Sequence, residues 1–305
     1  MARAKWVDLV DPERNELQQD LPKALQESAI KQLLSPAAHD DEPRPTLQSH
    51  GDYVFGVFLV AVAVPDEDRV FYQEIDIVLT EDFLLTVRKT PPNEEPYDIS
   101  RVRAICPEGE EPEAGMILYH LVDDVAERFL DLIDAVNDEI DELEDHVEAW
   151  PNEQVRQRLS DLRHDLLHIR RTLAPTRDAV RRIVDGRLEL DEGLEAFPHD
   201  VELHFADVYD KLLRASEGLE LSRDLVASAR DYHQSKISND QNEVMKKLTA
   251  IASILLVPTF IVGLYGQNFK HIPELHWSFG YWWSWGWIVA STGFQLVYFR
   301  RKQWI

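Results

Sequence analysis

The chain has 305 residues, and its 56 acidic and 32 basic residues give a formal net charge of −24. This acidic balance argues against a nucleic acid as partner, because phosphate binding needs a basic surface, and favours cations or basic molecules. The single cysteine, Cys106, excludes an internal disulfide and a paired-cysteine metal site. The N-terminal residues lack the apolar core of a signal peptide, so we expect them to stay in the cytoplasm.

Residues 1–114 are predicted to form a small cytoplasmic domain of mixed α and β structure. The segment LPKALQESAIKQLL favours a helix, whereas residues 53–89 contain three runs rich in β-branched and aromatic residues. Pro65-Asp66 and Glu81-Asp82 separate these runs, and the loop TPPNEEPYD follows them. The expected fold class is therefore an α+β domain at the start of the chain.

Residues 115–200 change to a period of 3.6 and predict an acidic helical hairpin that is broken at Pro151-Asn152. The stretch 123–148 holds twelve acidic residues against one basic residue, Arg128. Such a run is either an ordinary solvated face or a surface whose position divalent cations regulate. His164 and His168 share one helix face, but two ligands do not make a zinc site, so we favour solvent exposure for both.

A third helix is predicted from about Val201, through a stalk at 201–247, into an apolar stretch that ends near Gly266. A helix of about 65 residues would be on the order of 100 Å long. Residues 248–269 and 277–299 contain no formal charge, and each stretch is long enough to cross a bilayer of roughly 30 Å. Tryptophan and tyrosine crowd the ends of the second stretch, as in an interfacial aromatic belt.

The basic residues around these stretches predict the orientation of a membrane hairpin. Lys246 and Lys247 precede the first span, and the tail 300–305 with Arg300, Arg301 and Lys302 follows the second. By the positive-inside rule both flanks are cytoplasmic, and residues 270–276 form the outer loop. We therefore expect a multi-pass protein of the plasma (inner) membrane with both termini inside.

A seam of small and polar residues repeats every 3.5 residues along the third helix, the period that keeps one helix face toward its partners. The seam consists of Asp231, Ser235, Ser238, Asn242, Met245, Thr249, Ala252, Leu256, Thr259, Gly263 and Gly266. One interpretation is a packing seam, since membrane helices associate through small residues. The other is a pore lined by several copies, in which neutral oxygens bind the hydration shell of a cation such as Mg²⁺.

The chain shows no phosphate-binding loop, no GxSxG and no HExxH motif, so it is not predicted to be an enzyme. The segment 242–283, NEVMKKLTAIASILLVPTFIVGLYGQNFKHIPELHWSFGYWW, resembles the membrane end of the CorA family of magnesium channels. The resemblance extends through SRDL and the stalk to the C-terminal YFRRKQW, and it is weaker but recognisable through DEIDELED and DYVFGVF. The resemblance implies a homopentameric funnel in which the first span lines the pore.

The family signature at the outer pore mouth is Gly-Met-Asn. Gly266 and Asn268 match it, and Gln267 replaces the methionine, so the Asn268 amides would form the ring that meets a hydrated ion. The resemblance also implies polar pore positions at Thr259, Asn242 and Asp231, and apolar constrictions at Met245, Leu248 and Leu256. Asp207 matches a cytoplasmic carboxylate that senses metal between subunits. The implied ion, both transported and regulatory, is Mg²⁺, with Co²⁺, Ni²⁺ and Zn²⁺ as alternatives.

Three departures from the family pattern keep other functions open. Gln267 is not methionine, and variants of the signature accompany metals other than magnesium. Lys31-Gln32 stands where relatives often have an acidic pair, which would deprive Asp207 of its partner. The outer loop carries Lys270 in place of a common acid, leaving Glu274 to attract cations. We expect ordinary surface histidines at His271 and His276, although both suit a softer metal.

The sequence therefore supports three hypotheses. The first is a magnesium channel gated by cytoplasmic metal. The second is a Zn²⁺, Co²⁺ or Ni²⁺ transporter of the same fold, with proton coupling left open. The third is a membrane-anchored metal sensor that conducts nothing. A repeat of 3.5 residues cannot count helices, so the pentamer rests on the resemblance.

Overall fold

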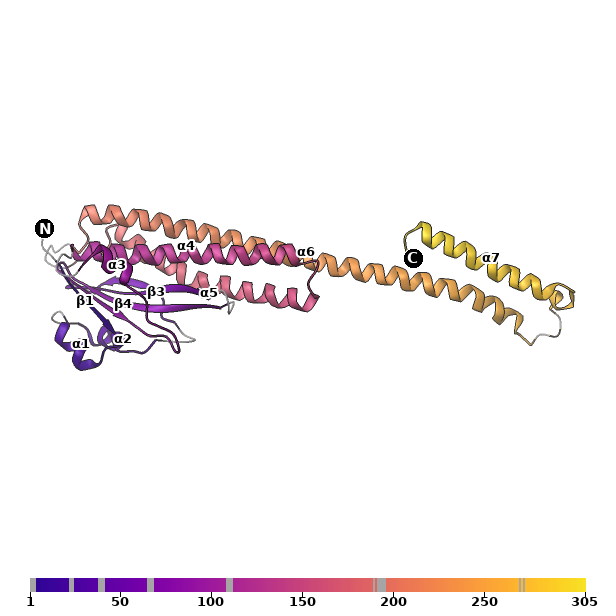
Figure 1. The fold of residues 1–305 in the computed structure, drawn as a ribbon, viewed down its shortest axis with the longest axis horizontal. Helices are drawn as coiled ribbons and strands as arrows, with labels where there is room; N and C mark the ends of the chain where they lie inside the picture. The colour runs from indigo at the N-terminus through magenta and orange to yellow at the C-terminus, as the bar shows by residue number, and fades with distance from the viewer. Residues whose placement is uncertain are drawn as a thin grey trace. The chain divides into compact units, whose positions relative to one another are not determined.

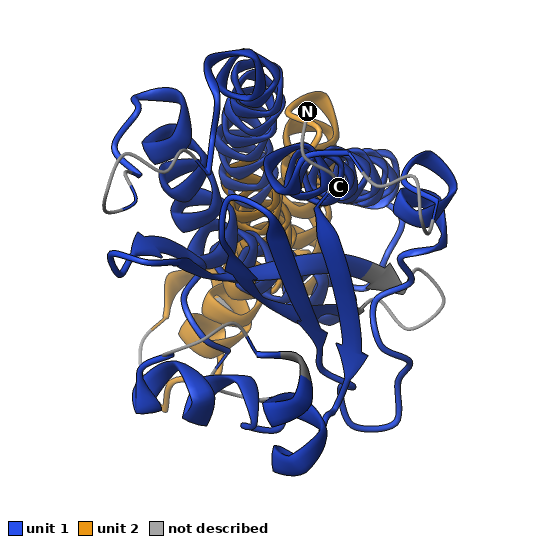
Figure 2. Cartoon of the chain, turned by 90° about the vertical axis from the view of Figure 1, so that its left-hand side faces the viewer, with its two compact units in different colours: residues 1–230 blue, residues 231–305 orange. Residues whose placement is uncertain are grey.

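A five-stranded sheet forms the centre of unit 1, residues 1–230, and unit 2 comprises residues 231–305 (Figure 2). The computed structural model describes residues 4–21, 25–37, 42–64, 69–107, 112–188, 190, 196–268, 270 and 272–305. The strands are β1 (Lys5–Val10), β2 (Thr46–Ser49), β3 (Val54–Val64), β4 (Arg69–Leu79) and β5 (Phe83–Arg88). Their order is β1-β5-β4-β3-β2, with β1 parallel to β5 and the other neighbours antiparallel.

The three strand-like runs of the sequence are β3, β4 and β5, which confirms the α+β character of the first domain. The prediction missed β1 and β2. The short helices are α1 (Arg14–Asp20), α2 (Glu27–Leu33) and α3 (Ser100–Ile105), and only α2 falls within the segment expected to be helical. The helix α2 begins at Glu27, so Leu21, Leu25 and Gln26 precede it, and residues 22–24 of that segment lie outside the described residues.

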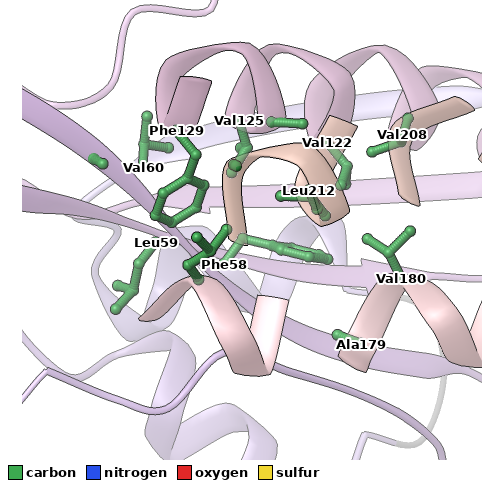
Figure 3. Packing of buried hydrophobic residues seen from close by; sticks show 14 of the residues in the cluster. Phe58, Leu59, Val60, Val122, Val125, Phe129, Ala179, Val180, Val208 and Leu212 are labelled. Carbon is green, nitrogen blue, oxygen red and sulfur yellow. The ribbon is translucent and has the colours of Figure 1, made fainter. Parts of the chain in front are cut away.

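Three long helices cover one face of the sheet: α4 (Ala114–His146), α5 (Asn152–Val184) and α6 (His199–Tyr265) (Figure 1). Apolar side chains of the four elements meet in a single buried cluster (Figure 3). They include Phe58, Leu59 and Val60 of β3, Val122, Val125 and Phe129 of α4, Ala179 and Val180 of α5, and Val208 and Leu212 of α6. The helical period of 3.6 places these side chains on the sheet side of each helix.

The other face of the sheet carries a smaller buried cluster, in which Leu17 of α1 and Leu33 of α2 pack with Val78, Leu85 and Val87 of the strands. Along β4, Glu74, Asp76 and Val78 point to this same face because side chains alternate along a strand. Two acidic residues are therefore enclosed between the sheet and α2.

Unit 2 contains the C-terminal part of α6, the 3₁₀ helix η3 (Pro273–His276) and α7 (Gly280–Arg301). Among the described residues, α6 alone contains a stretch long and apolar enough to cross a membrane by length and composition. The second predicted span, 277–299, falls largely in the 22-residue α7, whose tryptophans and tyrosines each add a polar group to a largely apolar helix. Its place in a membrane stays a prediction.

Candidate functional site

One face of α6 in unit 2 is partly covered. The residues on this face are buried or half-buried: Ala250, Ser253, Ile254, Val257, Pro258, Ile261 and Tyr265. The helix α7 runs back along this part of α6 (Figure 1). Its own less exposed residues repeat with a helical period, namely Ser284, Ile288, Ser291, Thr292, Gln295 and Phe299. The two matching patterns indicate that α7 covers this face of α6.

The small-residue seam lies on the opposite side of α6. Successive residues of an α-helix are turned by about 100°, so Leu256, Thr259 and Gly263 lie roughly 140–200° round the axis from Ile254. All three are exposed, as is every other residue of the seam from Asp231 to Gly266. The seam is thus not the contact between the two helices of unit 2.

The hydroxyl groups of the seam donate their hydrogens to the helix backbone. Thr249 Oγ1 donates to the carbonyl of Met245 at 2.8 Å, and Thr259 Oγ1 donates to the carbonyl of Leu255 at 2.7 Å. Ser235 Oγ donates to the carbonyl of Asp231 at 2.9 Å. A hydroxyl used in this way keeps its two acceptor lone pairs. The seam therefore presents acceptors to water and cations, and a hydrated cation offers the complementary donors.

The helix α6 ends at Tyr265, and the Gly-Gln-Asn tripeptide follows at once. The Gly266 N–H donates to the carbonyl of Val262 at 2.9 Å. Gly266 is not among the residues with positive φ, so it is not a left-handed helix cap. A Cβ at this position would lie 3.1 Å from the Val262 oxygen, a close approach that favours glycine. Gln267 and Asn268 are exposed, and their amides are open to solvent.

The three apolar residues predicted as constrictions are exposed on α6. Met245 and Leu248 are each 58% exposed and Leu256 is 68% exposed. Met245 and Leu256 belong to the seam, and Leu248 adjoins it next to Thr249. Large apolar side chains thus interrupt a polar surface, so they need a partner of some kind, whether another copy or lipid.

Asp207 lies on α6 in unit 1, is exposed, and makes no hydrogen bond or ion pair within the part of the chain that the structure describes. Lys211, one turn later, instead binds two carboxylates of α4, Asp123 at 2.6 Å and Glu127 at 2.5 Å. Burial, and then the carboxylates of Asp123 and Asp207, raise the pKa of Tyr119. Asp207 is therefore a free carboxylate in an acidic setting.

Within one chain, Asp207 and Gln32 are not brought together, because α6 and α2 cover opposite faces of the sheet (Figure 2). The Gln32 Nε2 donates to Glu74 Oε1 at 3.1 Å, whereas Lys31 is exposed.

In the outer loop, Glu274 lies in η3 and is half-buried, and its backbone carbonyl accepts the Trp277 N–H at 3.2 Å. Lys270 and His276 are exposed. His271 lies outside the described residues. In the described part of the loop, no carboxylate–histidine pair is formed.

His168 Nε2 lies 3.1 Å from Glu42 Oε2, and the rings of His164 and His168 are 6.4 Å apart. His168 is half-buried, which corrects the expectation of solvent exposure for this residue, whereas His164 is exposed. No group of three or more histidine, cysteine or acidic side chains suited to a metal ion occurs among the described residues. Cys106 is buried in the main core, as expected of a packing residue.

Sequence reasoning missed a buried ionic cluster. Lys89 Nζ lies 2.8 Å from Asp76 Oδ2 and forms an ion pair with Glu74, and the side chains of all three are at most 5% exposed. Burial raises the pKa of Asp76 to about 8, and the Glu74 carboxylate adds to this against the opposing effect of Lys89. The available signal was the pair of acidic residues inside the strand sequence EIDIVL, where a covered strand would be apolar.

A second buried carboxylate belongs to Asp124, ten residues after the start of α4. Arg101 and Arg128 each form an ion pair with it at 3.1 Å, and the Tyr97 hydroxyl donates to it. Burial, followed by the hydrogen bond to Asp124 and its charge, raises the pKa of Tyr97 above its usual value. This network is fully paired and ties α4 to α3 and to the residues before it, so we assign it to stability.

Comparison with known proteins places these features in context. The family model for CorA-like Mg²⁺ transporter proteins matches residues 2–301. The cobalt/magnesium transport protein CorA of Thermotoga maritima is 31% identical over 268 residues, which is 86% of this chain and 73% of that protein. The structure of the CorA magnesium transporter of Methanocaldococcus jannaschii gives a TM-score of 0.79 at 23% identity, over 99% of this chain and 92% of that one. The full-length CmaX structure gives 0.68 at 23% identity, over 99% and 89%.

Proposed function

The chain belongs to the family of CorA-like Mg²⁺ transporter proteins, and we propose that it carries Mg²⁺ through a pore lined by the seam of α6 from several copies of the chain. The observation that carries this proposal is the side on which the seam lies. It faces away from α7 and, apart from Leu256, it carries threonine hydroxyls and small residues where a lipid-facing surface would carry large apolar ones. Its two threonine hydroxyls keep their acceptor lone pairs. Such a surface suits the water shell of a divalent cation, since Mg²⁺ dehydrates reluctantly.

The pore we propose is a homopentamer, as the family resemblance implies, in a plasma membrane with both termini in the cytoplasm. Asn268 of each copy would form the outer ring that meets the hydrated ion, just beyond the close turn at Gly266. Thr259, Asn242 and Asp231 would continue the polar path inward. An inside-negative potential of 100 mV favours entry of a divalent ion by about 4.6 kcal/mol, which is twice the value for one charge. No charged ring in the membrane is then needed to draw the ion in.

Gating would depend on two kinds of residue on α6. Met245, Leu248 and Leu256 would form apolar constrictions that close by dewetting. Asp207, which has no partner in its own chain among the described residues, would bind regulatory metal at a contact between copies. Because Gln32 is an amide bound to Glu74, this contact would not use the acidic pair that relatives often carry.

The test is ion entry into dye-loaded liposomes that contain the purified protein under an inside-negative potential. Mg²⁺, Zn²⁺, Co²⁺ and Ni²⁺ are compared for the wild type, for Asn268→Ala, and for the control Asn239→Ala, an exposed α6 asparagine outside the seam. We expect Mg²⁺ entry that Asn268→Ala reduces at least tenfold and Asn239→Ala leaves unchanged. Entry of Zn²⁺ without Mg²⁺ would transfer the assignment to a transition-metal transporter, with Gln267 as its first candidate determinant. No entry of any ion through folded, oligomeric protein would favour a non-conducting sensor.

A further inference from the structure

Two adjoining grooves lie along α5 in unit 1, beside residues 42–48. The larger has a volume of about 790 Å³ and the smaller about 460 Å³, and both are lined by Arg44 and Pro175. The larger volume falls within the range of about 300–1,000 Å³ that is typical of small-molecule sites. Neither groove includes a residue of the seam or a candidate sensing residue.

The grooves are basic in a chain that is strongly acidic. Their lining contains four arginines, Arg44, Arg170, Arg171 and Arg182, against two carboxylates, Glu42 and Asp178. Among the described lining residues, the four positive and two negative charges give a local balance of +2, whereas the whole chain carries −24. A concave surface lined by one sign of charge concentrates ions of the opposite sign. The grooves are therefore suited to an anion.

Two of the arginines contact other groups of the protein. Arg182 donates to the backbone carbonyl of Leu47 on the edge strand β2 at 3.1 Å. Arg170 lies 3.7 Å from Glu220, in an ion pair that is half exposed on both sides. Glu42, the one acid of the larger groove, is bound to His168. Arg182, Arg170 and Glu42 therefore each already have a partner within the protein.

Arg44 and Arg171 are different, because neither makes a hydrogen bond or ion pair within the described part of the chain. A guanidinium presents five donors in a planar fork that matches carboxylate and phosphate oxygens. Both side chains are exposed and line the larger groove, so their donors are open to the oxygens of an anionic ligand.

The wall of the groove also offers an acceptor. Pro175 lies inside α5 and has no N–H, so the carbonyl of Arg171 lacks the donor that residue 175 of a helix would normally supply. A backbone carbonyl without its helical donor can accept a hydrogen bond from a hydroxyl or amino group. The combination of anion-binding arginines and one acceptor fits a phosphate ester with donor groups better than it fits a bare inorganic anion.

We propose that the groove between α5 and residues 42–48 binds a small phosphate ester, of the size and chemistry of a nucleotide, through Arg44 and Arg171. This site is separate from the proposed pore, and its existence does not depend on ion conduction. It would give the cytoplasmic unit of a cation transporter a second input besides the metal itself.

The test is isothermal titration of the full-length protein in detergent, with EDTA present so that no divalent cation takes part. The probes are ATP and inorganic pyrophosphate. The wild type is compared with the double variant Arg44→Gln/Arg171→Gln and with the control Arg156→Gln/Arg187→Gln. The control removes the same charge from two exposed arginines outside the groove, each paired with a nearby carboxylate. Thermal unfolding of both variants establishes that they are folded.

We expect saturable ATP binding with one site per chain, weakened at least tenfold in the groove variant and changed less than twofold in the control. A tenfold loss corresponds to about 1.4 kcal/mol, which is less than the loss expected from two charge-assisted hydrogen bonds. Equal weakening of ATP binding in both variants would show that only the net charge of the protein matters, and it would overturn the proposal. The absence of saturable ATP binding to the wild type would also overturn it. Pyrophosphate binding as tight as that of ATP would overturn the assignment to an ester.

Discussion

Replacing Asp76 by asparagine is expected to stabilise the protein at pH 8 and to leave its stability almost unchanged at pH 5. The wild-type interior encloses two carboxylates, Glu74 and Asp76, with one ammonium group, Lys89, and all three are nearly inaccessible to water. Lys89 also donates to the Gln32 carbonyl and the Ser35 hydroxyl, each at 3.0 Å. Asp76→Asn leaves one buried carboxylate, Glu74, to pair with one buried ammonium group, Lys89, without changing the size of the side chain at position 76.

The size of the effect follows from the pKa of Asp76, which burial raises from 3.8 to about 8. Between these two values the unfolded chain releases the proton and the folded chain keeps it, so stability falls as pH rises. The slope is about 1.4 kcal/mol per pH unit, or roughly 4 kcal/mol between pH 5 and pH 8. At about 2–4 °C of Tm per kcal/mol, the wild type should lose on the order of 10 °C relative to Asp76→Asn over this interval.

The assay is thermal unfolding of the full-length protein in detergent, followed by circular dichroism at pH 5, 6, 7 and 8. The matched control is Asp138→Asn, which removes an exposed carboxylate of α4 and should run parallel to the wild type. The reasoning would be refuted if Asp76→Asn melted below the wild type at pH 8. It would be refuted equally if the difference between them did not grow from pH 5 to pH 8.

Two further predictions concern unit 2. A Cβ on Gly280 would lie 2.1 Å from the backbone oxygen of Glu274, whereas a Cβ on Gly286 meets nothing within 4 Å; Gly280→Ala should therefore lower the Tm of the purified protein and Gly286→Ala should not. Thr259→Val removes a hydroxyl of the seam, and Thr292→Val removes one from α7. In the liposome assay only Thr259→Val should therefore reduce Mg²⁺ entry, by roughly tenfold. Equal effects of the two substitutions would argue against a pore lined by the seam.

The long elements were predictable because their signals are local. The period of 3.6 from Gly115 onward predicts α4 and α5, and the alternating β-branched runs predict β3, β4 and β5. The strand β1 was missed because its six residues acquire their role only by pairing with β5, as in Trp6 with Leu84, far along the chain. β2 has four residues, too few to show a period.

The candidate site, too, could be predicted only where its signal is local. The repeat of the seam is a property of one helix, so it is visible in the sequence, but which side α7 covers depends on tertiary packing. The covered face of Ile254 and Ile261 leaves Thr259 and Gly263 free, and nothing in the helix sequence alone determines that choice. The buried cluster was missed for a related reason. Glu74 and Asp76 alternate along β4 as solvent-facing residues do, and only the position of α2 over that face encloses them.

This enclosure also gives Gln32 a defined partner, at a position where the family resemblance implies an acid. Gln32 Nε2 lies 3.1 Å from Glu74 Oε1 and donates to it. An aspartate or glutamate there would turn that hydrogen bond into a contact between two carboxylates, with a third at Asp76 and a single ammonium, Lys89, to balance them. Like charges at this distance in a buried setting repel by several kcal/mol, or force a proton onto one of them. Gln32 is therefore coupled to the interior charges of β4 and β5, and an acidic residue at position 32 would need either a further bound proton or a different set of charges at 74, 76 and 89.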